Sequence, residues 1–185
     1  MSVMFTIKSW HVLLPLAIVM FAVIMTRTFV AKRYSIRQSA LLTAFAAYAI
    51  GTLHFVFFPV EVNIGEYANL TPWYSTIQWI PLLTMDAKTF LLNMVLFVPF
   101  GLALPLLRGS NGSIGQVAYA AFWVSLVFEL SQLAIRVAVG SGRMTDINDL
   151  IANSLGGALG YVIYRRLVAV KPFDRLLRGF RLQSR

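Results

Sequence analysis

The sequence ELSQLAIRVAVGSGRMTDINDLIANSLGGALG, residues 129–160, places charged and amide side chains within and beside segments that are otherwise as apolar as lipid. A charged side chain at the centre of a membrane-spanning helix costs about 2.5–3.5 kcal/mol on insertion scales. Such side chains therefore normally face the interior of a helix bundle or a polar cavity. This stretch predicts a bundle of membrane helices that encloses a polar site.

The composition of the whole chain also favours a membrane protein. Of the 185 residues, 58% are hydrophobic and 12% are charged, whereas soluble domains are about 45–50% apolar. The length fits one small domain, residues 1–185. Cysteine is absent, which excludes a disulfide framework. We interpret the net charge of +9 as Lys and Arg that hold cytoplasmic segments in place, and not as a nucleic-acid interface.

Five segments approach the length of about 20 apolar residues that a membrane span requires. They are about His11–Val30, Ser39–Val60, Thr89–Leu107, Ile114–Val139 and Asn148–Leu167. The predicted fold class is therefore an all-α integral membrane protein, a bundle of about five transmembrane helices.

The distribution of Lys and Arg predicts the orientation of these spans. The loop Ala31–Gln38 and the tail beyond Tyr164 are basic, whereas the segment Glu61–Lys88 has one Lys and three acidic residues. Because Lys and Arg accumulate in cytoplasmic segments, we expect the first loop and the C-terminus to be cytoplasmic. The N-terminus is then expected outside.

Two segments outside the spans have patterns of their own. The outer segment carries Trp73 and Trp79, which are typical of the membrane interface, and it predicts an interfacial or re-entrant piece with a short helix. In the tail, about residues 168–185, apolar and basic residues fall on different helical faces. This predicts an amphipathic helix on the cytoplasmic leaflet.

The polar residues of the spans fall at similar depth. At about 1.5 Å per residue, Glu129 lies ~22 Å from the start of its helix at Ile114, in the predicted outer half of the membrane. Residues near the outer ends of the third and fifth segments reach the same layer. A pocket open to the extracytoplasmic side is expected, and the predicted ligand-binding residues are Asn93, Glu129, Gln132, Arg136, Arg143, Asp146, Asp149 and Asn153.

The charges in this set have alternative roles. Glu129 is expected to pair with Arg136 or Arg143, which lowers the cost of burying each charge. Such pairs alternatively serve only to fix helix register, and Asp146 alternatively serves as a helix N-cap. Gly156 and Gly160 form a G-x-x-x-G step, which predicts close packing against another helix.

A resemblance to a known family rests on an ordered set of motifs. These are LLNMVLFVPFG at Leu91–Gly101, FELSQ at Phe128–Gln132, then Arg136, Arg143-x-x-Asp146-x-x-Asp149, Asn153, Gly156 and Gly160. Over about residues 61–165 the chain resembles the VanZ-like family of small bacterial membrane proteins. The resemblance implies a plasma-membrane protein with a role in envelope chemistry or in resistance to teicoplanin, a lipid-tailed glycopeptide that binds peptidoglycan precursors.

Two functions fit these residues, and a binder is favoured because the pocket has no recognisable nucleophile or metal motif. In the first, Arg136 and Arg143 contact phosphate or carboxylate of an envelope lipid, a lipid-linked cell-wall precursor or a lipoglycopeptide. In the second, an enzyme uses Glu129 or Asp149 as a general base.

No cofactor is expected, although Asp146 and Asp149 offer oxygen ligands for a divalent cation. A transporter has little support because no inverted repeat is visible. A homo-oligomer joined at the Gly156–Gly160 face is an alternative assembly.

Overall fold

The computed structural model describes residues 2–68, 71–82, 85–110 and 112–182. Its helices are α1 (Ser9–Met25), α2 (Ile36–Phe57), α3 (Ala87–Arg108), α4 (Ile114–Val139), α5 (Ile147–Ala169) and α6 (Lys171–Arg178). Its strands are β1 (Val3–Ile7), β2 (Val60–Ile64), β3 (Ile77–Gln78) and β4 (Thr145–Asp146). A π-helical turn, Thr26–Val30, extends α1, and 3-10 turns occupy Gly65–Tyr67 and Trp73–Thr76.

Four of the helical segments are long and apolar enough to cross a membrane: Ser9–Val30, Ile36–Phe57, Ala87–Arg108 and Ile114–Val139. The predicted all-α membrane fold is therefore confirmed. The fifth predicted span corresponds to α5, which is 23 residues long but is not among the four because it contains many polar residues. That crossing and the orientation of the termini stay predictions.

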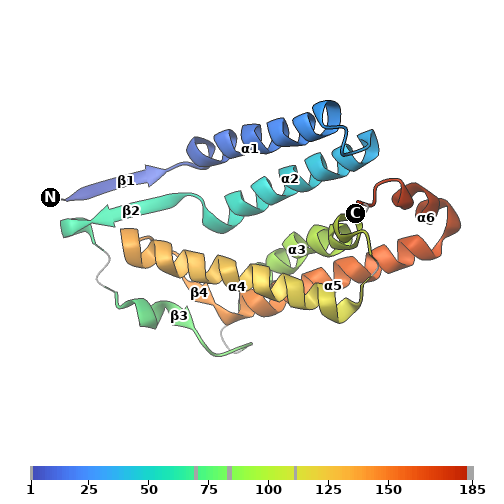
Figure 1. Cartoon of the computed structure of the whole chain (residues 1–185). Helices are drawn as coiled ribbons and strands as arrows, with labels where there is room; N and C mark the ends of the chain where they lie inside the picture. The colour runs from blue at the N-terminus through green and yellow to red at the C-terminus, as the bar shows by residue number, and fades with distance from the viewer. Residues whose placement is uncertain (1, 69–70, 83–84, 111, 183–185) are drawn as a thin grey trace.

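The helices form two groups (Figure 1). The α1–α2 hairpin lies along one side, and α3, α4 and α5 form the more closely packed part beside it. The hydroxyl of Tyr48 on α2 donates a hydrogen bond of 2.9 Å to the carbonyl of Leu96 on α3. The buried aromatic core lies between α3 and α4, where Phe97 and Phe100 pack near Ala121.

Close contact between α3 and α5 depends on glycine. A Cβ atom built on Gly156 or Gly160 would overlap the backbone carbonyl oxygen of Met94 or Val98 on α3. A Cβ on Gly101 of α3 would likewise overlap the carbonyl oxygen of Gly157. The G-x-x-x-G face of α5 is therefore covered by α3 of the same chain, and a dimer through this face would require α3 to move away.

Local signals in the sequence explain where the helices begin and end. Ser35 and Ser113 cap α2 and α4, each in a reciprocal pair with a glutamine three residues later. The carboxylate of Asp86 caps α3 by accepting from the backbone of Thr89. Gly140 ends α4 with φ of 66°, a left-handed conformation that favours glycine.

The outer segment differs from the sequence prediction. Its described residues include a short 3-10 helix, Trp73–Thr76, but they also form a second 3-10 turn and two strands that the sequence did not predict. β2 pairs antiparallel with β1, with Val3 opposite Ile64, and β3 pairs in parallel with β4. The sequence did not reveal these ladders because each strand is at most five residues long and its partner lies far away in the chain.

The tail forms a shorter helix than the apolar pattern suggests. α6 exposes Phe173 and Leu176, but it ends at Arg178, and Phe180 lies in the turn that follows. After α6 the chain folds back on the bundle, because the Arg181 guanidinium donates to the Tyr164 hydroxyl at 2.8 Å. Residues 183–185 of the predicted tail lie outside the described residues.

Candidate functional site

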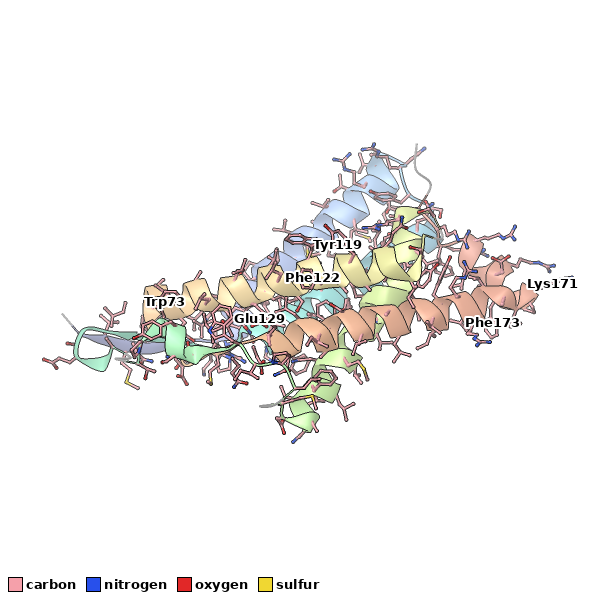
Figure 2. All side chains as sticks on the ribbon, turned by 90° about the horizontal axis from the view of Figure 1, so that it is seen from below. Trp73, Tyr119, Phe122, Glu129, Lys171 and Phe173 are labelled. Atoms are coloured by element: carbon pink, nitrogen blue, oxygen red, sulfur yellow. The ribbon has the colours of Figure 1, made fainter. Side chains whose placement is uncertain are left out.

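A cavity of about 470 Å³ lies where the ends of four helices meet. It lies near the C-terminal ends of α2 and α4 and the N-terminal ends of α3 and α5. In Figure 2, Glu129 on α4 lies in the half of the molecule that contains Trp73, and Lys171 and Phe173 of α6 lie at the opposite end. Six of the eight predicted ligand-binding residues line this cavity: Asn93, Glu129, Gln132, Arg143, Asp149 and Asn153.

Helical spacing explains why these side chains share one cavity. Residues three or four apart lie on the same face of a helix. This relation joins Glu129 to Gln132 on α4, and Asp149 to Asn153 on α5. Phe55 and Phe128 add aromatic rings to the wall.

Glu129 is buried, with 4% of its surface exposed. Its Oε2 atom accepts a hydrogen bond of 3.0 Å from the backbone N–H of Asp146. The described residues include no ion pair to Glu129, since their ion pairs all involve Asp174. The predicted pair with Arg136 or Arg143 is therefore wrong. A single backbone N–H therefore binds the Glu129 carboxyl group, and no cationic side chain among the described residues pairs with it.

The two arginines bind backbone carbonyls instead. Arg136 is buried, and its Nη1 donates to the carbonyl oxygens of Ser141 and Arg143, both at 3.1 Å. Arg143 donates from Nη2 to the carbonyl of Phe58 at 2.8 Å. Arg136 therefore holds the turn between α4 and β4, and Arg143 ties that turn to the end of α2. Sequence spacing contains no signal for such carbonyl partners.

Arg136 and Asp146 lie outside the cavity lining. Arg136 lines a separate hollow with Asn63 and Trp73. The Asp146 carboxylate accepts from the backbone and the side chain of Asn148 at 2.8 and 2.9 Å. It is thus the N-cap of α5, which is the alternative role that the sequence left open.

Ser125 connects Asp149 and Asn153, although the sequence pattern did not indicate it as a site residue. Asn93 on α3 and Asp149 on α5 both line the cavity. Asn153 donates from Nδ2 to the hydroxyl of Ser125 at 2.8 Å, and Ser125 donates in turn to the Asp149 carbonyl at 3.5 Å. Ser125 is fully buried. Its position four residues before Glu129, on the same helical face, was the available signal.

A second hollow, an apolar groove of about 650 Å³, lies on the other side of Glu129. Leu126 and Leu130 of α4 and Ile151 and Leu155 of α5 form much of its wall. Trp79, in the segment that follows β3, lies at its edge. Because Glu129 lines both the cavity and the groove, polar and apolar surfaces are adjacent here.

The described part of the chain contains no group of three or more His, Cys, Asp or Glu side chains arranged to hold a metal ion. Asp146 and Asp149 do line a small hollow of about 180 Å³ together. The Asn148 side chain already donates to the Asp146 carboxylate, and a divalent cation in this hollow stays a prediction.

The fold and this site define a class: an all-α integral membrane protein with a cavity at one end of its helix bundle that both polar and apolar side chains line. The model of the VanZ/LLP1 family matches residues 16–169, and the chain therefore belongs to this family. It is similar to Protein VanZ of Enterococcus faecium, with 30% identity over 142 residues, 71% of this chain and 80% of that protein. No solved structure matches the chain.

Proposed function

We propose that this protein binds the polar head group of an envelope amphiphile and thereby contributes to resistance against teicoplanin-type lipoglycopeptides. The amphiphile is an envelope lipid, a lipid-linked cell-wall precursor or the lipoglycopeptide itself. All three combine a polar head with a long apolar chain. The proposal extends the family membership, which covers most of the chain, to a ligand class.

One observation carries the proposal: Glu129 lines both the apolar groove and the cavity whose wall contains the polar side chains. When the head group of a ligand is in the cavity, its apolar chain can lie in the groove on the other side of Glu129. Ligand sites are typically apolar hollows with a few polar groups that fix orientation. The pair of hollows has this character, and its two parts suit the two parts of an amphiphile.

The predicted topology supports the same proposal. With the N-terminus outside, the cavity end of the bundle faces the extracytoplasmic leaflet. The hollow beside Trp73 is at that end. Lipid-linked precursors and drugs that act on the cell surface are present in that leaflet.

Susceptibility tests the proposal in cells. The full chain is expressed in a teicoplanin-susceptible bacterium, and the minimal inhibitory concentration is compared for wild type, Glu129→Gln and Glu66→Gln at equal protein level. Glu66 is an exposed residue of the outer segment, so Glu66→Gln is a matched charge control. We expect wild type and Glu66→Gln to raise the inhibitory concentration and Glu129→Gln to lose the effect. Equal protection by all three proteins would contradict the proposal.

A second candidate function is an enzyme that acts on a lipid head group. Two carboxyl groups, those of Glu129 and Asp149, favour it. Glu129 and Asp149 both line the cavity, where a general base needs to be. Ser125 is not suited as a nucleophile because it is fully buried and its hydroxyl donates to a backbone carbonyl. Turnover of a lipid substrate by the purified protein, abolished in Asp149→Asn, would favour this candidate over the binder.

A further inference from the structure

The hydrogen-bonding groups of the 470 Å³ cavity are unequally used. Two of its donor side chains each bind one backbone carbonyl. Gln132 donates from Nε2 to Val56 at 2.8 Å, and Arg143 donates from Nη2 to Phe58 at 2.8 Å. Both side chains thus hold the end of α2, and their capacity to donate to a ligand is reduced.

The carboxyl oxygens of the cavity wall have few hydrogen bonds from the part of the protein that the structure describes. Glu129 has one bond to its Oε2 atom, and Oε1 has no hydrogen bond to any described residue. Among the lining residues, two carboxylates, Glu129 and Asp149, face one guanidinium, Arg143. The wall therefore has more carboxyl groups than guanidinium groups, and carboxyl oxygens accept hydrogen bonds from a ligand donor.

Asn153 provides independent evidence for a missing donor. Its side chain is 5% exposed, and its Oδ1 atom is buried without a hydrogen-bond partner among the described residues. The amide orientation is set by Ser125, whose hydroxyl donates to the Asp149 carbonyl and therefore accepts from Nδ2. A buried acceptor without a donor costs free energy. Asn153 thus lines the cavity and carries a buried acceptor without a donor beside it in the described part of the chain.

We propose that the cavity binds a primary ammonium group, with Asn153 Oδ1 and the Glu129 and Asp149 carboxylates as acceptors. The proposal rests on the proposed function and specifies the head group of the amphiphile. An ammonium group supplies a positive charge and three N–H donors, which fits this set of acceptors. The rings of Phe55 and Phe128 also line the wall, and aromatic faces attract cations. This assignment replaces the phosphate or carboxylate head group that the two arginines suggested.

Three single-chain amphiphiles test the head group while the apolar chain stays constant. Dodecylammonium, dodecyltrimethylammonium and dodecyl phosphate are each titrated calorimetrically into the full-length protein in a neutral maltoside detergent. We expect dodecylammonium to bind about tenfold more tightly than either of the others, which corresponds to about 1.4 kcal/mol. The trimethyl compound has the charge but no N–H, so it separates hydrogen bonding from charge.

Matched variants link the preference to the cavity. Glu129→Gln and Asp149→Asn keep the side-chain shape and remove one charge each, and both are expected to abolish the preference for dodecylammonium. Glu66→Gln removes an exposed charge of the outer segment and is expected to keep it. A melting temperature for each variant identifies any loss of binding that comes from unfolding. If only one of Glu129→Gln and Asp149→Asn folds, the binding preference of that variant tests the assignment.

The outcomes separate this inference from the proposed function. Tighter binding of dodecyl phosphate, or equal binding of both cations, overturns the ammonium assignment and leaves an amphiphile site in place. No binding of any of the three overturns both. Where dodecylammonium is preferred, native mass spectrometry identifies the source of the amine. A retained aminophospholipid points to the membrane, and its absence points to an added amine such as that of a drug.

Discussion

Replacing Gly156 by alanine perturbs the contact on which the α3–α5 pair depends. The added Cβ would overlap the carbonyl oxygen and carbon of Met94, which belong to the α3 backbone and cannot rotate away. Overpacking of this kind costs about 1–3 kcal/mol, and the higher helix propensity of alanine offsets ~0.5–1 kcal/mol. Since rigid backbone atoms place the cost near its upper limit of about 3 kcal/mol, we expect a net loss of about 2–2.5 kcal/mol in the free energy of unfolding.

Thermal unfolding in detergent, followed by circular dichroism at a helical wavelength, measures this loss. For a domain of this size, 1 kcal/mol corresponds to about 2–4 °C, so Gly156→Ala is expected to melt about 4–10 °C below wild type. Gly51→Ala is the control. Gly51 lies in α2 with no heavy atom within 4 Å of its built Cβ, and alanine there is expected to stabilise by ~0.5–1 kcal/mol.

The sign of the difference between the two variants is the test. Opposite shifts support direct backbone contact between α3 and α5. If Gly156→Ala melts at or above the wild-type temperature, as Gly51→Ala does, the close approach of the two helices is refuted. Because Met94 follows Asn93, the same substitution is also expected to weaken ligand binding in the cavity.

Three further predictions concern other parts of the chain. Arg136→Met leaves two carbonyls without their donor, so we expect a loss of about 1–3 kcal/mol in unfolding free energy with an unchanged ligand preference; unchanged stability in chemical unfolding would contradict its role in the turn. Hydrogen bonds from Thr89 lower the pKa of the Asp86 carboxyl group in the folded protein. The ionised carboxylate therefore stabilises the fold at a pH above the pKa that Asp86 has in the unfolded chain. This stabilisation is lost as the pH falls through the lower pKa of the folded protein. When the free energy of unfolding is measured against pH, we expect wild type to lose more stability in acid than Asp86→Asn does. The same pH dependence in both proteins would refute the role of Asp86 as a cap. Because the chain has no cysteine, Ser75→Cys and Lys171→Cys can be labelled singly: in intact cells an impermeant maleimide is expected to label Ser75→Cys alone, and the reverse pattern would invert the predicted topology.

Much of the cavity followed from the sequence because helix geometry has a fixed rise. Counting along three helices was sufficient to place Asn93, Glu129, Asp149 and Asn153 at one depth, and these four residues line one cavity. The helix bounds were also accessible, since apolar length and capping residues define them. α4 begins and ends where the sequence placed it, at Ile114 and Val139.

The remaining features depend on the path of irregular segments, which periodicity does not describe. Arg136 and Arg143 were expected to bind Glu129, yet the turn after Gly140 brings backbone carbonyls within their reach. The β1–β2 ladder joins segments separated by two helices. Charge and spacing indicate which residues are unusual, but they do not indicate which partner satisfies each one.

The central claim is that the cavity beside Glu129 holds the head group of an amphiphile. Native mass spectrometry of the full-length protein, purified in mild detergent, tests it most directly through the lipid that remains bound to wild type, Glu129→Gln and Glu66→Gln. We predict a specific lipid adduct on wild type and Glu66→Gln that is absent from Glu129→Gln at equal folded fraction. The same adduct on all three proteins, or on none of them, would contradict the claim.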